Sequence, residues 1–205
     1  EEILNKLVKR IKKEREKQNN YEIFQRQLEQ FKPVIKERYL DYLLSNRLSY
    51  SKMKEENDYL ELNLNDRNFV VMAVEFKCKL EAVERLGIKE IFNNKLLKNY
   101  NKEIIDNYPD KYIIILNYDG NEKANIVYKK LLQTSKMIIN YNKNIFNRSI
   151  TIGIGNLYET PDQISNSYKE ANEALEYQLL YGPGEVYLFK DINPKQDIEL
   201  NYPFK

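Results

Sequence analysis

Few side chains in this sequence of 205 residues can do acid–base or nucleophilic chemistry. Histidine is absent, which excludes Ser-His-Asp and Cys-His catalysis and any metal site with an imidazole ligand. Cys78 is the single cysteine, so neither an intrachain disulfide nor a thiolate zinc site can form. Catalysis would therefore depend on carboxylates, lysines, tyrosines, serines or Cys78.

Cys78 lies between Lys77 and Lys79, and neighbouring cations favour a reactive thiolate. A redox or nucleophilic role is one interpretation. However, the sequence has no histidine that could deprotonate the thiol. We interpret Cys78 as a buried or merely tolerated residue.

Gly153 and Gly155 lack the third glycine and the lysine that dinucleotide-binding and phosphate-binding loops need. We expect them in a strand against which another backbone packs closely. The alternative is a residual ligand cleft near Gly155, Asn156 and Glu75.

The charge balance also excludes classes of function. Lys and Arg total 33 against 31 Asp and Glu, whereas non-specific nucleic-acid binding needs a basic face. The 17 tyrosines are therefore expected in the core and at its edge rather than stacked on bases. No apolar run approaches the roughly 20 residues that cross a bilayer, and no signal peptide is recognisable. We expect a cytoplasmic protein without membrane contact.

Residues 1–31 contain no glycine or proline, and their apolar residues recur at spacings of three and four, which predicts a long helix. Two narrow apolar stripes flank a polar stretch at residues 12–20. Narrow stripes favour packing against a second helix, so we expect a homodimer, with local packing as the alternative. The candidate dimerisation residues are Leu4, Leu7, Ile11, Tyr21, Phe24, Leu28 and Phe31.

Pro33 predicts a break in this helix, because proline disrupts a helix interior. A second helix is expected over residues 33–45 and a third over residues 51–60, which together form a helical hairpin.

From Phe69 onward, short apolar runs rich in β-branched residues alternate with helical patterns. This order predicts an α/β fold with helices covering a sheet. The predicted strands are residues 69–76, 111–118, 149–155 and 185–189. The predicted helices are residues 80–86, 89–100, 122–139 and 161–181.

This order of strands and helices resembles a GGDEF domain, the fold of the nucleotide-cyclase-like diguanylate cyclases. Residues 149–155 resemble a strand of that family, and residues 168–175, Gly182 and residues 186–189 resemble its last helix and last strand. The resemblance implies a cyclase-like sheet covered by helices.

The same resemblance implies that the family's chemistry is missing. Tyr108 and Pro109 stand where the family has two phosphate-approaching glycines, and Lys111 stands at its metal-binding glutamate. Ala73 replaces the aspartate of the first strand, with Glu75 two positions later. We therefore expect no enzyme, no metal and no cofactor. Glu75, Asp110 and Asn156 remain weak ligand-binding candidates.

The N-terminal part extends the resemblance. Residues 34–48 resemble the element that precedes the degenerate GGDEF-like domain in YesN-type response regulators of the AraC family. In that family a receiver domain comes first and an AraC-type helix-turn-helix domain comes last, and residues 202–205 resemble the segment before the latter. Binding to DNA would then be through that C-terminal domain alone.

The expected organisation is a helical dimerisation and linker region at residues 1–60 and a degenerate GGDEF-like α/β domain at residues 61–205. The expected function is non-catalytic signal transmission in a regulator of transcription. The alternative is a sensor domain that binds a nucleotide or a small metabolite.

Overall fold

The computed structural model describes residues 2–45, 56–64, 67–107, 109–118 and 121–192, with side chains described from residue 15 onward except residues 16 and 19. The chain divides into two compact units, residues 1–40 and residues 41–205. The predicted helix start at residues 51–55 and the segment 202–205 lie outside the described residues. Residues 56–59 are helical, within the predicted third helix.

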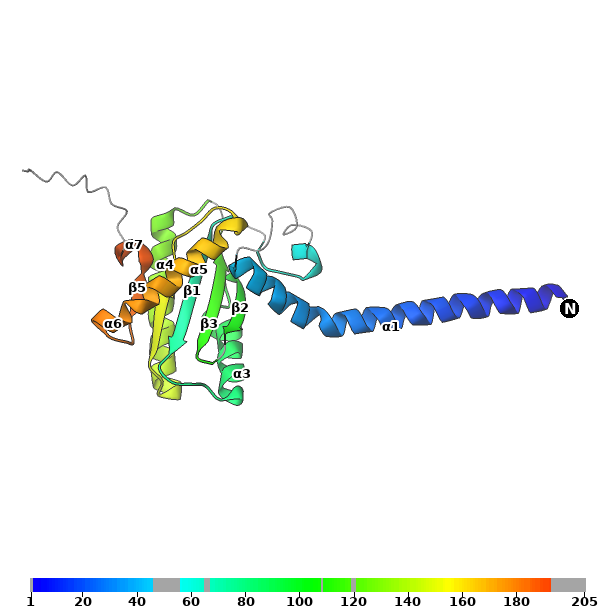
Figure 1. Cartoon of the computed structure of the whole chain (residues 1–205), viewed down its shortest axis with the longest axis horizontal. Helices are drawn as coiled ribbons and strands as arrows, with labels where there is room; N and C mark the ends of the chain where they lie inside the picture. Colours follow the sequence, from blue (N-terminus) through cyan, green and yellow to red (C-terminus); the bar gives the residue numbers. More distant parts are fainter. Residues whose placement is uncertain (1, 46–55, 65–66, 108, 119–120, 193–205) are drawn as a thin grey trace, which may run out of the picture. The chain divides into compact units, whose positions relative to one another are not determined.

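Helix α1 (Glu2–Leu44) runs for 43 residues and continues through Pro33 (Figure 1). The predicted break at Pro33 is therefore wrong. An interior proline removes one backbone hydrogen bond and bends the helix, but the turns on either side can still form. Among the described residues, no helix is both long enough and apolar enough to cross a membrane.

A mixed α/β architecture forms the second unit, around a five-stranded sheet of order β2-β3-β1-β4-β5. Its strands are β1 (Phe69–Phe76), β2 (Asn101–Asn107), β3 (Lys111–Asn117), β4 (Ile150–Ile154) and β5 (Val186–Leu188). Neighbouring strands are antiparallel except for the parallel pair β4 and β5. The four predicted strands are confirmed, but β2 was not predicted. Its only strand signal is the pair Ile104 and Ile105 between polar residues, as expected for a strand at the edge of a sheet.

Helices cover both faces of the sheet (Figure 1). Helix α3 (Ala82–Ile91), a π-helical turn (Phe92–Leu96) and α4 (Ala124–Phe146) enclose the main core on one face. A 3-10 turn (Pro161–Gln163) leads into α5 (Ile164–Glu176), which packs on β1 and β4. Two short helices, α6 (Gln178–Tyr181) and α7 (Phe189–Ile192), flank β5. The predicted separation of two helices near Gly87 is wrong, because α3 passes through this residue.

Strand β1 lies at the centre of the unit. Val70, Met72, Val74 and Phe76 belong to the core enclosed by α3 and α4. The alternate residues face α5, because successive side chains of a strand point to opposite faces. Because helices bury both faces of β1, its sequence is a continuous apolar run rather than an alternation of apolar and polar residues.

Helix α5 approaches β4 so closely that only glycine fits. A Cβ atom on Gly153 would lie 2.1 Å from the carbonyl oxygen of Ala171, and one on Gly155 would lie 2.1 Å from that of Ser167. The expectation of close backbone packing at these glycines is confirmed. At Gly155, the position that a side chain would take is filled by Ser167 of α5.

Candidate functional site

Strands β2 and β3 form a hairpin in which Asn107 pairs with Lys111, and Pro109 and Asp110 lie in its turn. Tyr108 lies outside the described residues. The backbone N–H of Phe76, the last residue of β1, donates to the carbonyl oxygen of Asp110 over 2.8 Å. The turn therefore meets the end of β1, and Asp110 and Glu75 lie at the same end of the sheet.

Glu75 is paired with Lys111 across β1 and β3. The Lys111 Nζ atom lies 2.8 Å from Glu75 Oε1, and both side chains are half-buried. The other carboxylate oxygen, Oε2, accepts a hydrogen bond from the side-chain amide of Gln178 in α6. Both oxygens of this carboxylate are thus engaged by donors from the chain itself.

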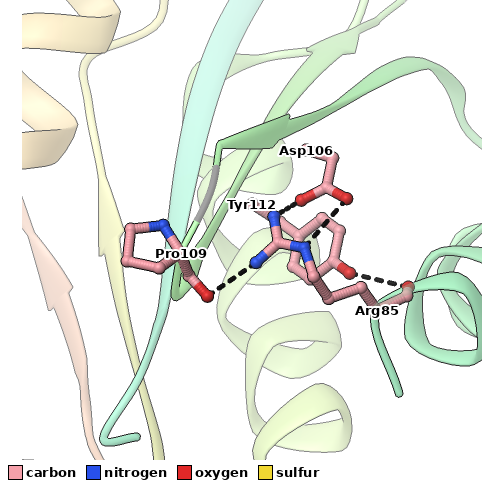
Figure 2. A network of polar contacts seen from close by, with 4 residues as sticks. All are labelled: Arg85, Asp106, Pro109 and Tyr112. Carbon is pink, nitrogen blue, oxygen red and sulfur yellow. Dashed lines mark hydrogen bonds and ion pairs between the residues drawn. The ribbon is translucent and has the colours of Figure 1, made fainter. Parts of the chain in front are cut away.

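Arg85 of α3 holds the hairpin from the other side of the sheet (Figure 2). Its Nη1 donates to the carbonyl oxygen of Pro109 over 2.6 Å, and its Nε donates to Asp106 Oδ2 over 3.1 Å. Its Nη2 forms an ion pair with Asp106 Oδ1. The hydroxyl of Tyr112 donates to the backbone carbonyl of Arg85 over 2.7 Å. The turn is therefore fixed by a buried guanidinium.

Tyr112 completes this network from β3. Burial raises the pKa of its hydroxyl to about 12, against a smaller opposing effect of Arg85. The Arg85 guanidinium also lies 5.6 Å from the centre of the Tyr112 ring. The phenol remains a neutral donor throughout the physiological pH range.

The sequence analysis missed Arg85. A signal was present, because Arg85 shares one helix face with Ile88 and Phe92 at spacings of three and four residues. A cation on an apolar face predicts a buried partner. The partner, Asp106, lies on the strand that was not predicted.

Asn156 lies at the opposite end of the sheet. In the β1–β4 register Met72 faces Ile154, whereas Glu75 faces Thr151. The Asn156 backbone N–H donates to Glu170 of α5 over 2.7 Å, and the Tyr158 hydroxyl also donates to Glu170. The structure therefore brings Glu75 and Asp110 together but does not bring Asn156 to them. A single cleft holding Gly155, Asn156 and Glu75 is not formed.

The described side chains of the second stripe on α1 are largely exposed. The exposed fractions are 63% for Tyr21, 55% for Phe24 and 60% for Phe31, and Leu28 is half-buried. Leu4, Leu7 and Ile11 lie in the helix, but their side chains are outside the described residues. We call Tyr21, Phe24, Leu28 and Phe31 the aromatic stripe.

Cys78 is half-buried just after β1. Its Sγ accepts a hydrogen bond from Arg148 Nη1 over 2.8 Å, and Arg148 Nη2 lies 2.8 Å from Glu84 Oε1. Glu84 also accepts from the backbone N–H of Glu81, and this bond together with Arg148 lowers the pKa of the Glu84 carboxyl. Among the described residues, no three cysteine or acidic side chains gather into a group that could hold a metal ion.

A family model and two solved structures are similar to this chain. The family model for the GGDEF-like domain matches residues 51–177, more than half of the chain. The active GGEEF domain of a diguanylate cyclase from Vibrio cholerae is similar in structure, with a TM-score of 0.47 and 10% identity, over 67% of this chain and 90% of that chain. The GGDEF domain of TpbB (YfiN) from Pseudomonas aeruginosa gives a TM-score of 0.38 and 14% identity, over 72% and 90%. No curated protein sequence is significantly similar to the chain.

Proposed function

Because the chain belongs to the family of GGDEF-like domains, we propose that it is a non-catalytic signal-transmission and dimerisation module of a bacterial DNA-binding response regulator. In this proposal residues 1–60 form the helical dimerisation and linker region, and residues 61–205 form the degenerate GGDEF-like domain. A receiver upstream and an AraC-type helix-turn-helix domain downstream, both outside this sequence, supply the phosphorylation site and the DNA reader.

The observation that carries the proposal is the exposed aromatic stripe of α1. Its residues follow one another at intervals of three, four and three, the spacing of a coiled-coil seam. An isolated helix gains little stability from propensity alone, and most helical stability comes from packing an apolar face. A second copy of the same helix is the partner that supplies this packing symmetrically.

The absence of catalysis is supported by the Glu75 carboxylate. A divalent cation in this family would need carboxylate oxygens free to coordinate it. Both oxygens of Glu75 are engaged by Lys111 and Gln178, and Ala73 offers a methyl group. The ammonium group of Lys111 would also repel the cation. The residues present therefore do not fit a metal ion.

In the proposed relay, the helical linker has two states. Phosphorylation of the receiver shifts the helix register or the dimer geometry, and the GGDEF-like domain passes the change onward. The polar stretch at residues 12–20 is the weakly packed and therefore switchable part of the linker.

Sedimentation of the full chain and of a chain lacking residues 1–31, measured across a range of concentrations, tests the proposal. A dimer that becomes a monomer on truncation supports it. Monomers in both cases contradict it and favour the sensor function described next.

A second candidate is a sensor for a nucleotide or another small metabolite. A cavity at the same end of the sheet as the hairpin favours it. Saturable binding of GTP that is lost when Glu75 and Asp110 are substituted would place the ligand at the hairpin instead of in this cavity.

A further inference from the structure

A cavity of about 590 Å³ lies between the second half of α4 and the edge strand β5. One wall comes from a single face of α4, because its lining residues are three or four positions apart. The opposite wall is the loop before β5, with Pro183 and Gly184. The residues of the α4 wall are Lys136, Ile139, Asn140 and Lys143.

The floor of the cavity is apolar. Ile150 belongs to the hydrophobic core, and Ile139 and Val186 pack against it while remaining partly exposed. Partly exposed apolar side chains beneath a polar rim are the usual surroundings of a ring or another apolar group of a small ligand.

The rim carries positive charge. Lys136, Lys143 and Arg148 line the cavity, against one lining carboxylate, that of Glu185. Arg148 is paired with Glu84, but in the described part of the chain neither Lys136 nor Lys143 forms an ion pair. These two lysines lie about 10 Å apart along α4, with Asn140 between them, so their flexible ammonium groups can reach one anion.

The turn of chain after α4 shapes the entrance. Asn147 ends the helix in the left-handed conformation, with φ of 50°, and directs the chain toward β4. The last carbonyl groups of the helix carry partial negative charge. The anionic group of a ligand should therefore lie toward Lys136 and Asn140 rather than at Asn147.

We propose that this cavity binds a phosphate-bearing metabolite of about mononucleotide size. The phosphate lies between Lys136, Asn140 and Lys143, and the apolar or ring part covers Ile139, Ile150 and Val186. The volume is within the range of small-molecule sites. The lysines supply charge-assisted hydrogen bonds to the phosphate oxygens.

The cavity is connected to the hairpin by a chain of polar contacts. The N–H of Gly184 donates to Thr151 Oγ1 over 3.1 Å, and Thr151 donates to Gln178 over 2.9 Å. Gln178 in turn donates to Glu75, the partner of Lys111. The inference rests on the sensor function, and it is independent of dimerisation through α1, which sedimentation measures separately.

The test is a titration of the ¹⁵N-labelled chain in metal-free buffer, with inorganic phosphate as one probe and GMP as the other. We expect the amide signals of Asn140, Ser149 and Gly184 to shift, and GMP to bind more tightly than phosphate because its base covers the apolar floor. The double variant Lys136→Gln/Lys143→Gln should weaken GMP binding by at least about tenfold. The matched control Lys123→Gln/Lys129→Gln, which removes two exposed lysines of the other end of α4, should bind as the wild type does.

Several results would overturn the proposal. These are no shifts with either probe at millimolar concentration, equal affinity for phosphate and GMP, or shifts centred on the hairpin residues Asp110 and Lys111. Equal weakening by the two double variants would likewise show that only bulk charge matters. All four substituted lysines are exposed, so both variants should fold, and their unfolding midpoints check this.

Discussion

Lys111 and Glu75 face each other across the central strands, with Lys111 Nζ 2.8 Å from Glu75 Oε1. Here one ion pair and the Gln178 amide occupy the only carboxylate at the end of β1. The Lys111 side chain of the hairpin and the Glu75 carboxylate are therefore engaged in contacts within the chain.

Replacing Lys111 with glutamate should convert the ion pair into two facing carboxylates. Like charges directly opposite in a sheet are destabilising, so we expect Lys111→Glu to lose about 1 kcal/mol and about 2–4 °C in Tm without metal. Added Mn²⁺ should raise the Tm of this variant but not that of the wild type. Thermal unfolding with and without MnCl₂ measures both effects.

The control for this substitution is Lys77→Glu, which places the same charge on an exposed neighbour. If the Tm of the wild-type chain rose with Mn²⁺, or if the wild type formed a cyclic dinucleotide from GTP, Lys111 would not prevent a divalent cation from binding at Glu75.

Removing the Arg85 guanidinium should destabilise the second unit strongly. Arg85→Met keeps the length of the side chain but leaves Asp106 and the Pro109 carbonyl without their partner. Breaking a buried ion pair on one side costs about 3 kcal/mol or more. Urea unfolding measures the loss, and Lys89→Met on the same helix should cost far less. A loss of unfolding free energy under about 1 kcal/mol for Arg85→Met would show that the contacts of Arg85 with Asp106 and Pro109 contribute little to stability.

Two glycine substitutions should change the free energy of unfolding in opposite directions. Gly153→Ala places a methyl group against the Ala171 carbonyl and should cost about 1–3 kcal/mol of unfolding free energy. Gly87→Ala meets no atom within 4 Å in the interior of α3 and should stabilise by roughly 0.5–1 kcal/mol. Chemical denaturation of the two variants, side by side, checks the close approach of α5. Equal effects would argue against it.

Stability should fall at alkaline pH because of Tyr112. Its pKa is about 12 in the folded chain and about 10 in the unfolded chain. Between these values the folded chain holds a proton that the unfolded chain has lost, so the unfolding free energy decreases as pH rises through this window. Tyr112→Phe should show a flatter decrease. Denaturation curves from about pH 10 to about pH 12 measure the two slopes, and identical slopes would contradict the role of Tyr112.

Charges placed in the aromatic stripe should break the proposed dimer. We expect Phe24→Glu/Phe31→Glu to weaken self-association by at least about 100-fold, because carboxylates would be buried in the seam. The matched control is Ile23→Glu/Gln30→Glu, with the same charges and spacing one position away, on exposed residues outside the stripe. Sedimentation of both variants makes the comparison. Equal dissociation by both would indicate a charge effect unrelated to the stripe.

Local patterns were sufficient to predict much of the sheet. The apolar runs at β1, β3 and β4 are dense enough in β-branched residues that burial on both faces could be read from them. The sequence alone also shows Lys111 and Ala73 at the positions where the family that it resembles has acidic residues. The close packing at Gly153 and Gly155 was predicted because a strand retains glycine mainly where another backbone approaches.

Strand β2, the contacts of Arg85 and the position of Asn156 depend on pairings between residues far apart in the chain. Strand β2 is stabilised by its ladder to β3 rather than by its own composition, and Arg85 finds Asp106 only after that hairpin has formed. Helix α1 continues through Pro33 and helix α3 through Gly87 for a different reason. The free-energy cost of one unfavourable residue is smaller than the stability that the rest of the helix provides. Antiparallel register decided that Asn156 lies away from Glu75, since each step along β4 moves in the opposite direction to β1. Periodicity reports how a segment is buried, whereas a site requires knowing which segments meet, and only tertiary packing decides that.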